Sequence, residues 1–136
     1  MANLNTSYLG LSLKNPVIVS SSGLTNSVEK IVKLEEKGAG AVVLKSLFEE
    51  QIKYEAGNLI EKSNYPEAQD YLMNYLKNNS IDEYFKLIEG AKKSVRIPVI
   101  ASINCMTASE WISFAKDIES AGADALELNV FIVPTD

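Results

Sequence analysis

Two stretches of this sequence share one pattern: residues 36–46 read EKGAGAVVLKS and residues 119–129 read ESAGADALELN. Each begins with the predicted end of a helix, where Gly38 or Gly122 supplies the stop. Each then continues into an apolar run that is typical of a buried strand. The repeated helix–turn–strand unit is a weak internal repeat of the kind found in (β/α) barrels.

Two further apolar runs extend the same pattern along the chain. Residues 16–23 read PVIVSSSG and residues 97–104 read IPVIASIN, each bounded by proline, glycine or polar residues. With residues 41–46 and 125–133, they predict four buried strands. Ahead of them, residues 4–16 alternate around Gly10 and predict a small β-hairpin that ends at Asn15-Pro16.

Helical periodicity separates the predicted strands, over residues 26–38, 66–77, 80–95 and 107–122. Asn26 or Ser27 suits the cap of the first helix, and Thr107 with Glu110 forms a capping box for the last. Alternating strands and helices predict an α/β fold with a parallel sheet. A complete barrel needs roughly 200 to 250 residues, so 136 residues predict one domain. It is either an open four-stranded α/β domain or half of a TIM-type barrel, with about four β/α units behind the hairpin.

Composition narrows the possible classes of function. A net charge of −5 and the absence of a basic run argue against nucleic acid and anionic membrane as partners. The chain has one cysteine, Cys105, and no recognisable signal peptide, so we expect a cytoplasmic protein. Its lack of histidine excludes a Ser-His-Asp triad and histidine-bound zinc within the chain.

Polar residues follow the predicted strands where a barrel carries its site, at the carboxyl ends. They are Ser20, Ser21, Ser22, Lys45, Ser46, Ser102, Asn104 and Asn129. Lys45 could hold an anionic group or simply reach solvent. Asn129 could bind the edge of a heterocycle or tie down a loop. The serine run could admit a flat ligand or form an ordinary turn.

Four stretches, taken in order, resemble class 1 dihydroorotate dehydrogenases. They are LNTSYLGLSLKNPVIVSSSG (4–23), GAGAVVLKS (38–46), IPVIASINCMTASEW (97–111) and ADALELNVFIVP (123–134). The resemblance implies an FMN-dependent (β/α)8 barrel that oxidises dihydroorotate in pyrimidine biosynthesis, of which this chain would be the N-terminal half. It also implies that FMN binds Ser21, Ser22, Lys45, Ser46 and Asn129, and that Lys45 and Asn64 contact the small-molecule substrate.

The sequence departs from that family in three respects. Ile132 stands near the position of the family's catalytic cysteine and cannot accept a proton. The family's asparagine-rich substrate loop is not recognisable in residues 56–69, where Asn64 is the nearest candidate. The later strands, which carry a further flavin-contacting lysine and the phosphate-binding loops, have no counterpart here. We therefore assign no catalytic residue.

Two other interpretations stay open. The chain could be a non-catalytic half-barrel that binds a ligand or serves as an assembly unit. It could also be an aldolase-like barrel that uses Lys45 as a Schiff-base amine. In any half-barrel the fourth strand would expose an apolar edge, so we expect a homo-oligomer or association through that edge.

Overall fold

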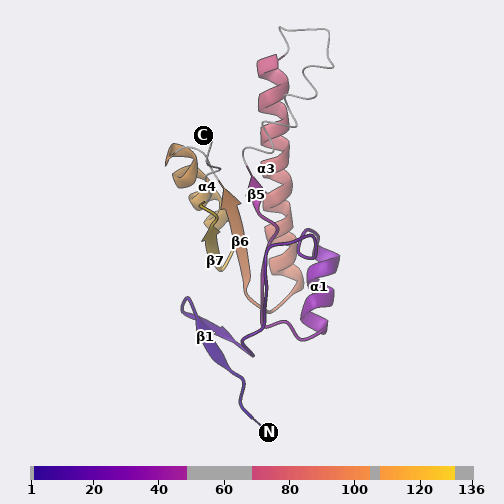
Figure 1. The fold of residues 1–136 in the computed structure, drawn as a ribbon. Helices are drawn as coiled ribbons and strands as arrows, with labels where there is room; N and C mark the ends of the chain where they lie inside the picture. Colours follow the sequence, from indigo (N-terminus) through magenta and orange to yellow (C-terminus); the bar gives the residue numbers. More distant parts are fainter. Residues whose placement is uncertain (1, 49–68, 105–107, 131–136) are drawn as a thin grey trace, which may run out of the picture.

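The computed structural model describes residues 2–48, 69–104 and 108–130 (Figure 1). Its elements, in chain order, are β1 (Thr6–Tyr8), β2 (Leu11–Leu13), β3 (Ile18–Val19), α1 (Val28–Glu36), β4 (Ala41–Val43), β5 (Leu47–Phe48), α3 (Gln69–Ser94), β6 (Val99–Asn104), α4 (Ala108–Ser120) and β7 (Ala125–Leu128). The predicted capping box and the end of the fourth strand fall partly outside these residues.

The predicted N-terminal hairpin is confirmed. Strands β1 and β2 pair antiparallel, with Thr6 opposite Leu13 and Tyr8 opposite Leu11. Leu9 and Gly10 form the turn, both with positive φ (53° and 77°). Two consecutive left-handed residues match the twist of a two-residue hairpin turn. The glycine adopts this conformation without a steric cost, whereas Leu9 does not.

The main sheet is parallel, in the order β3-β4-β6, with β7 on the other edge of β6. The α/β class is therefore confirmed. The predicted second strand is divided, since β4 ends at Val43 and β5 resumes against the same edge of β6 at Leu47. The first strand is also shorter than predicted, because only Ile18 and Val19 pair with β4.

A tyrosine side chain occupies the interruption between β4 and β5. The Tyr84 hydroxyl donates to the Ser102 carbonyl (2.9 Å) and accepts from the Ser102 N–H (2.7 Å). These are the backbone groups of β6 that β4 and β5 leave unpaired between Ile100 and Ile103. Because Ser102 is completely buried, the phenol satisfies groups that could not otherwise reach water.

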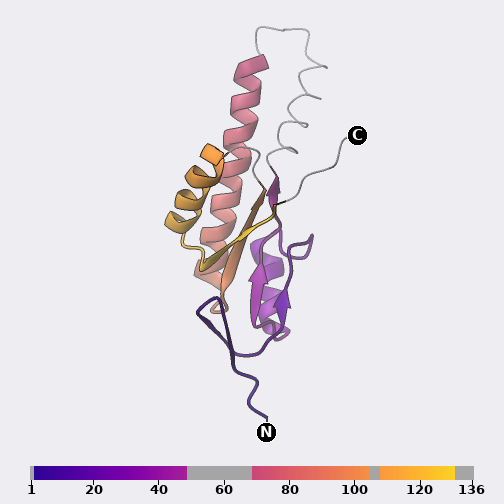
Figure 2. The ribbon, with the colours of Figure 1, turned by 60° about the vertical axis from the view of Figure 1, so that its left-hand side comes forward.

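The helices cover one face of the sheet and enclose the core. Figure 2 shows the long helix α3 alongside the strands, and α3 contacts both α1 and α4. The core combines residues of the helices and of the helix-facing side of the strands: Ile31, Val42, Leu44, Ile88, Ala91, Val99, Ala101, Ile103, Phe114 and Ile118.

The prediction of two helices over residues 66–77 and 80–95 was wrong, because one helix runs from Gln69 to Ser94. The predicted break at Ser80 rested on the polar residues Asn78-Asn79-Ser80. These residues cost a helix only a few tenths of a kcal/mol each, and no proline or glycine lies between Gln69 and Gly90. Packing of the following turns on the sheet outweighs this local preference.

Asn15 joins the exit of the hairpin to the turn that precedes β4. Its side-chain amide donates to the Gly38 carbonyl (2.9 Å), and its side-chain oxygen accepts from the Val17 N–H (2.9 Å). A Cβ atom at Gly40 would collide with the Asn15 carbonyl. The close approach of these two backbones therefore requires glycine, and it fixes the amino ends of β3 and β4.

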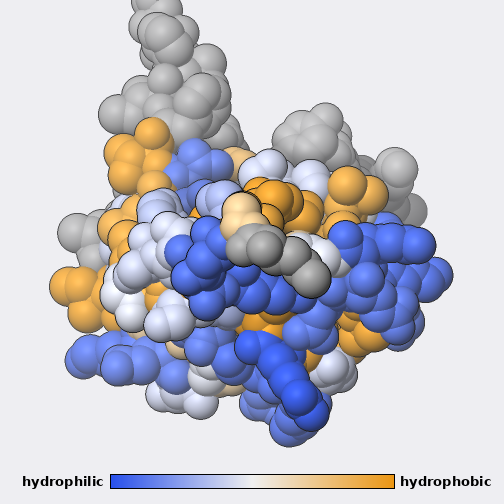
Figure 3. Space-filling view, turned by 90° about the horizontal axis from the view of Figure 1, so that it is seen from below, coloured by the Kyte–Doolittle hydropathy of each residue, from blue (hydrophilic) through white to orange (hydrophobic). Residues whose placement is uncertain are grey.

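Seen from the end that carries the hairpin, the surface is mostly hydrophilic with scattered hydrophobic side chains (Figure 3). Among the described helices, none is both long and apolar enough to cross a membrane.

Candidate functional site

The residues that the sequence predicted for the FMN site lie at or beyond the carboxyl ends of neighbouring parallel strands. We call this end of the sheet the rim. Ser21 and Ser22 follow β3, Lys45 and Ser46 lie between β4 and β5, and Asn129 follows β7. Parallel strands bring their carboxyl ends to one edge of the sheet. Residues that lie more than a hundred positions apart in the sequence therefore come together at the carboxyl ends of the strands.

Three serine hydroxyls and one carboxylate are joined by hydrogen bonds across the strands. Ser21 Oγ lies 3.0 Å from Ser46 Oγ, which lies 2.6 Å from Ser102 Oγ. Ser102 Oγ donates to Glu127 Oε1 at 2.5 Å. Ser46 and Ser102 are buried, and Ser102 and Glu127 are direct register partners on β6 and β7. We call these four residues the hydroxyl chain.

Tyr84 fixes the position of Ser102 in the hydroxyl chain, because its hydroxyl forms two hydrogen bonds with the Ser102 backbone. Burial raises the pKa of the Tyr84 phenol well above its usual range, and the nearby Glu127 carboxylate raises it further. The hydrogen bond to the Ser102 backbone acts in the opposite direction. Tyr84 is therefore a neutral hydrogen-bonding group at any physiological pH.

Lys45 is exposed, and its ammonium has no hydrogen-bond or ion-pair partner within residues 2–48, 69–104 and 108–130. Its backbone N–H is held by the Thr25 carbonyl at 3.4 Å. Thr25 itself is completely buried and donates to the Ser22 carbonyl (3.1 Å). The loop that carries Lys45 is thus fastened to the serine turn, while the ammonium stays available to an anionic or electron-rich group.

The two asparagines near the end of the sheet have different surroundings. Asn104 is buried, and its amide donates to the Asn129 carbonyl (2.6 Å), while the Asn129 N–H binds the Ile103 carbonyl (2.9 Å). The Asn129 side chain has no partner within the described part of the chain. The backbone around Asn129 is therefore fixed, and its side-chain amide is left for another group.

Ser22 behaves differently from Ser21. The Ser22 hydroxyl accepts from the Leu24 N–H (3.2 Å), and the Ser22 N–H donates to the Thr25 hydroxyl (3.3 Å). Its side chain stabilises the turn before α1, which leaves one hydroxyl lone pair for a ligand. Asn64, Cys105 and Ile132 lie outside the described residues.

Sequence reasoning missed Glu127 and Tyr84. Glu127 lies two residues before Asn129, on the same side of its strand, so period-two alternation could have placed it with the rim residues. Tyr84 had no such signal. Its helical spacing indicated a core position, and its hydrogen bonds depend on where β4 breaks.

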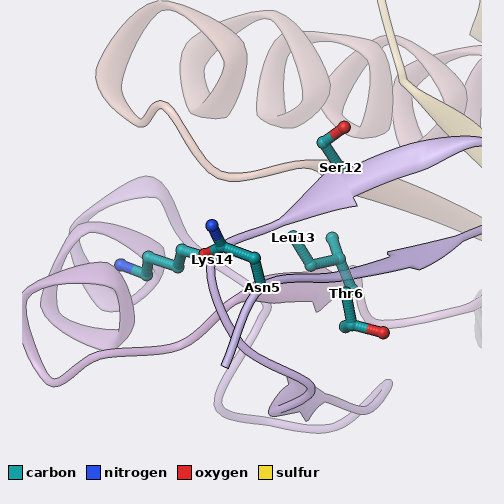
Figure 4. Close-up of a pocket in the computed structure, with 5 residues that line it drawn as sticks. All are labelled: Asn5, Thr6, Ser12, Leu13 and Lys14. Carbon is teal, nitrogen blue, oxygen red and sulfur yellow. The ribbon is translucent and has the colours of Figure 1, made fainter. Parts of the chain in front are cut away.

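The donor set suits a flat, heteroatom-rich ligand better than a metal. An ammonium, serine hydroxyls and an amide can bind the carbonyl and N–H groups of a heterocycle. The searched residues contain no group of three potential metal ligands. A shallow pocket of about 390 Å³ lies elsewhere, at the hairpin, where Asn5, Thr6, Ser12, Leu13 and Lys14 line it (Figure 4). None of the rim residues contributes to that pocket.

Comparison with known proteins identifies one family. The family model for dihydroorotate dehydrogenase matches residues 3–132. The chain is 34% identical over 133 residues to the catalytic subunit of dihydroorotate dehydrogenase B (NAD(+)) of Thermoplasma acidophilum, covering 96% of this chain and 42% of that protein. It is 36% identical over 123 residues to the corresponding subunit of Methanocella arvoryzae, covering 89% of this chain and 38% of that protein.

A relative with a different named substrate also matches. The chain is 25% identical over 139 residues to a subunit of the NAD-dependent dihydropyrimidine dehydrogenase of Escherichia coli, covering 93% of this chain and 32% of that protein. The chain therefore spans about two fifths of the length of the first two relatives and a third of this one.

Proposed function

The chain belongs to the dihydroorotate dehydrogenase family, and on that premise we propose that its rim forms part of an FMN site in a dihydroorotate dehydrogenase-like oxidoreductase. The family is one of TIM-type barrels. FMN, when bound, supplies the hydride acceptor. The observation that carries the proposal is the gathering of four groups at the carboxyl ends of the strands: the Lys45 ammonium and the Asn129 amide, which have no partner among the described residues, and the Ser21 and Ser46 hydroxyls.

We assign each residue one role toward that ligand. Lys45 supplies positive charge at an electron-rich ring edge or a substrate carboxylate, because its ammonium is unpaired among the described residues. Ser21, Ser22 and Ser46 line the strand ends against the ring, and Asn129 offers a donor and an acceptor together. Asn64 is proposed as a substrate contact on the family resemblance alone.

Dihydroorotate itself is not part of the proposal as the substrate of this chain. Isoleucine has no group that accepts a proton, and Ile132 stands near the family's cysteine base. The relatives also include a protein named for dihydropyrimidine. We therefore propose a flavin-dependent oxidoreductase of the CH–CH class that acts on a small cyclic substrate, in the cytoplasm.

We further propose that residues 1–136 form one domain, the first half of a barrel, that associates through the edge of β7. Among the described strands, β7 pairs with β6 alone. Leu128 and Val130 at this edge are 56% and 76% exposed, so they offer apolar surface beside the strand edge to a partner. This observation also favours the second candidate function, a non-catalytic assembly unit.

Titration with FMN distinguishes the two functions. We expect the flavin spectrum of FMN to change on binding, and Lys45→Met to weaken binding by about tenfold or more, since a hydrogen bond to a charged group contributes about 1.5 to 3 kcal/mol. Lys37→Met is the matched control, because Lys37 is an exposed lysine at the end of α1, before the amino end of β4.

Two results would contradict the flavin proposal. The first is no spectral change at any FMN concentration, and the second is an equal loss of affinity in both variants. Light scattering on the same sample tests the association. A monodisperse monomer would contradict pairing through β7.

A further inference from the structure

The hydroxyl chain is continuous across the sheet, from Ser21 after β3 to Glu127 on β7. Its three links measure 3.0 Å from Ser21 to Ser46, 2.6 Å from Ser46 to Ser102 and 2.5 Å from Ser102 to Glu127. The last two are short for hydrogen bonds between oxygens, and the shortest is the one that a carboxylate accepts. Each hydroxyl has only one proton to donate, and this restricts how the links can be oriented.

The carboxylate determines the direction of every link. An ionised carboxylate only accepts hydrogen bonds, so the Ser102 proton is committed to Glu127. Ser102 can then only accept from Ser46, which commits the Ser46 proton. Ser46 in turn can only accept from Ser21. All three hydroxyl protons therefore point along the chain toward Glu127.

The end of the chain at Ser21 is consequently an acceptor. Its proton is directed inward to Ser46, and one of its lone pairs accepts from the Ser46 N–H at 2.9 Å. A hydroxyl oxygen can accept twice, so one lone pair remains for a group outside the chain. Ser21 is half-buried at the rim, where a ligand could reach that lone pair.

We propose that Glu127 is a positioning residue that sets the hydrogen-bond polarity of the rim through Ser102 and Ser46. With Glu127 ionised, Ser21 accepts from an N–H or O–H of the bound ligand and disfavours a carbonyl oxygen or an unprotonated ring nitrogen at that point. The ligand is thus a heterocycle that presents a donor to Ser21. The identity of the ligand rests on the proposed function, whereas the direction of the chain does not.

Glu127 suits this role because the residue to which it binds, Ser102, is held in place. Parallel pairing places it opposite Ser102, and Ser102 is itself held by the two bonds from Tyr84 to its backbone. Hydrogen bonds in such a series polarise one another. A change at Glu127 must therefore reach Ser46 and Ser21, which Glu127 does not touch. A carboxylate with only a local structural role would affect Ser102 alone.

Proton NMR of the serine hydroxyls tests the direction. We expect Ser46 and Ser102 to give hydroxyl resonances protected from exchange with water, with the Ser46 proton close in space to the β-protons of Ser102. Glu127→Gln keeps the shape of the side chain but removes its charge, and should move both resonances upfield. Ser20→Ala is the control, because Ser20 is exposed and has no hydrogen-bonding partner in the described structure.

Three NMR results would overturn the proposal. They are a Glu127→Gln effect confined to Ser102, a Ser46 proton directed to Ser21, and hydroxyl protons that exchange too fast to be observed. A double-mutant cycle of Ser21→Ala with Glu127→Gln in urea unfolding gives an independent measure. The two changes should be non-additive by at least about twofold in the unfolding equilibrium constant, and additivity would contradict the chain.

Titration of the Ser21→Ala and Ser20→Ala variants with FMN separates the two proposals. We expect Ser21→Ala to weaken FMN binding and Ser20→Ala to leave it unchanged. Absence of FMN binding by the unmodified chain, with the hydroxyl resonances as expected, would refute the flavin site and leave the directed chain intact. FMN binding without the protected hydroxyls would refute the chain and leave the flavin site intact.

Discussion

Replacement of Tyr84 by phenylalanine should destabilise the fold strongly for the loss of a single oxygen atom. The Tyr84 hydroxyl is the partner of both the N–H and the carbonyl of Ser102, at 2.7 and 2.9 Å. Ser102 is completely buried and Tyr84 is 6% exposed. In the variant, both backbone groups would be left inside the protein without a partner.

The expected cost follows from these two groups. Each buried, unsatisfied polar group costs about 1 to 3 kcal/mol. The loss of a single oxygen atom leaves less room than one water molecule needs, so no water can replace the hydroxyl without a rearrangement of the surrounding side chains. We therefore expect Tyr84→Phe to lower the free energy of unfolding by about 2 to 4 kcal/mol. That is a large share of the roughly 5 to 15 kcal/mol of a typical domain.

Urea unfolding followed by circular dichroism measures this loss. Tyr8→Phe is the matched control, because Tyr8 is 49% exposed and its hydroxyl has no partner in the described structure. The control should stay within about 0.5 kcal/mol of the unmodified chain. If both variants lost the same small amount, Tyr84 would not be completing the sheet, and the reasoning would be refuted.

The pH dependence gives a second test of Tyr84. Because burial raises the pKa of its phenol in the folded state, the folded protein holds this proton more tightly than the unfolded chain. The corresponding stability is fully present below the pKa of the unfolded tyrosine, about 10, and decreases as the pH rises above it. In Tyr84→Phe, which has no phenol to titrate, the free energy of unfolding should therefore decrease less steeply at alkaline pH than in the unmodified chain. An unchanged alkaline profile would contradict the assignment.

Two further predictions concern the amino ends of the strands. Gly40→Ala should destabilise the chain by at least about 2 kcal/mol in urea unfolding, because its Cβ would collide with the Asn15 carbonyl. Gly23→Ala, which meets nothing within 4 Å, should stay within about 1 kcal/mol, and similar losses would contradict the collision. Asp124→Ala should cost about 1 to 3 kcal/mol, because Asp124 accepts from the Val99 N–H at 2.7 Å, and unchanged hydrogen exchange at Val99 would contradict that bond.

The hairpin and the alternation of strands and helices followed from local patterns. Gly10 and the flanking alternation predicted β1 and β2, because a two-residue turn with positive φ needs little beyond its own sequence. The apolar runs predicted the parallel strands, since a strand covered on both faces has no polar alternation. The error in α3 arose where local polarity at Ser80 was weaker than the packing of the whole helix.

The sequence also predicted which residues would gather at one edge of the sheet. Lys45, Ser46 and Asn129 each follow an apolar run, and parallel strands present their carboxyl ends together. This rule needs only the direction of the strands. It does not specify which side chains bind one another, and so it gave no reason to separate Ser21, which faces Ser46, from Ser22, which holds its own turn.

The tertiary structure alone decided the contacts that depend on register. Glu127 became the end of the hydroxyl chain because β7 pairs with β6 so that Glu127 faces Ser102. Tyr84 became part of the sheet because β4 breaks where the α3 side chain reaches it. The sequence by itself determined the hairpin, the alternation of strands and helices and the end of the sheet that carries the candidate site, since these follow from local periodicity. Register and helix placement come from packing between distant segments, which no local pattern contains.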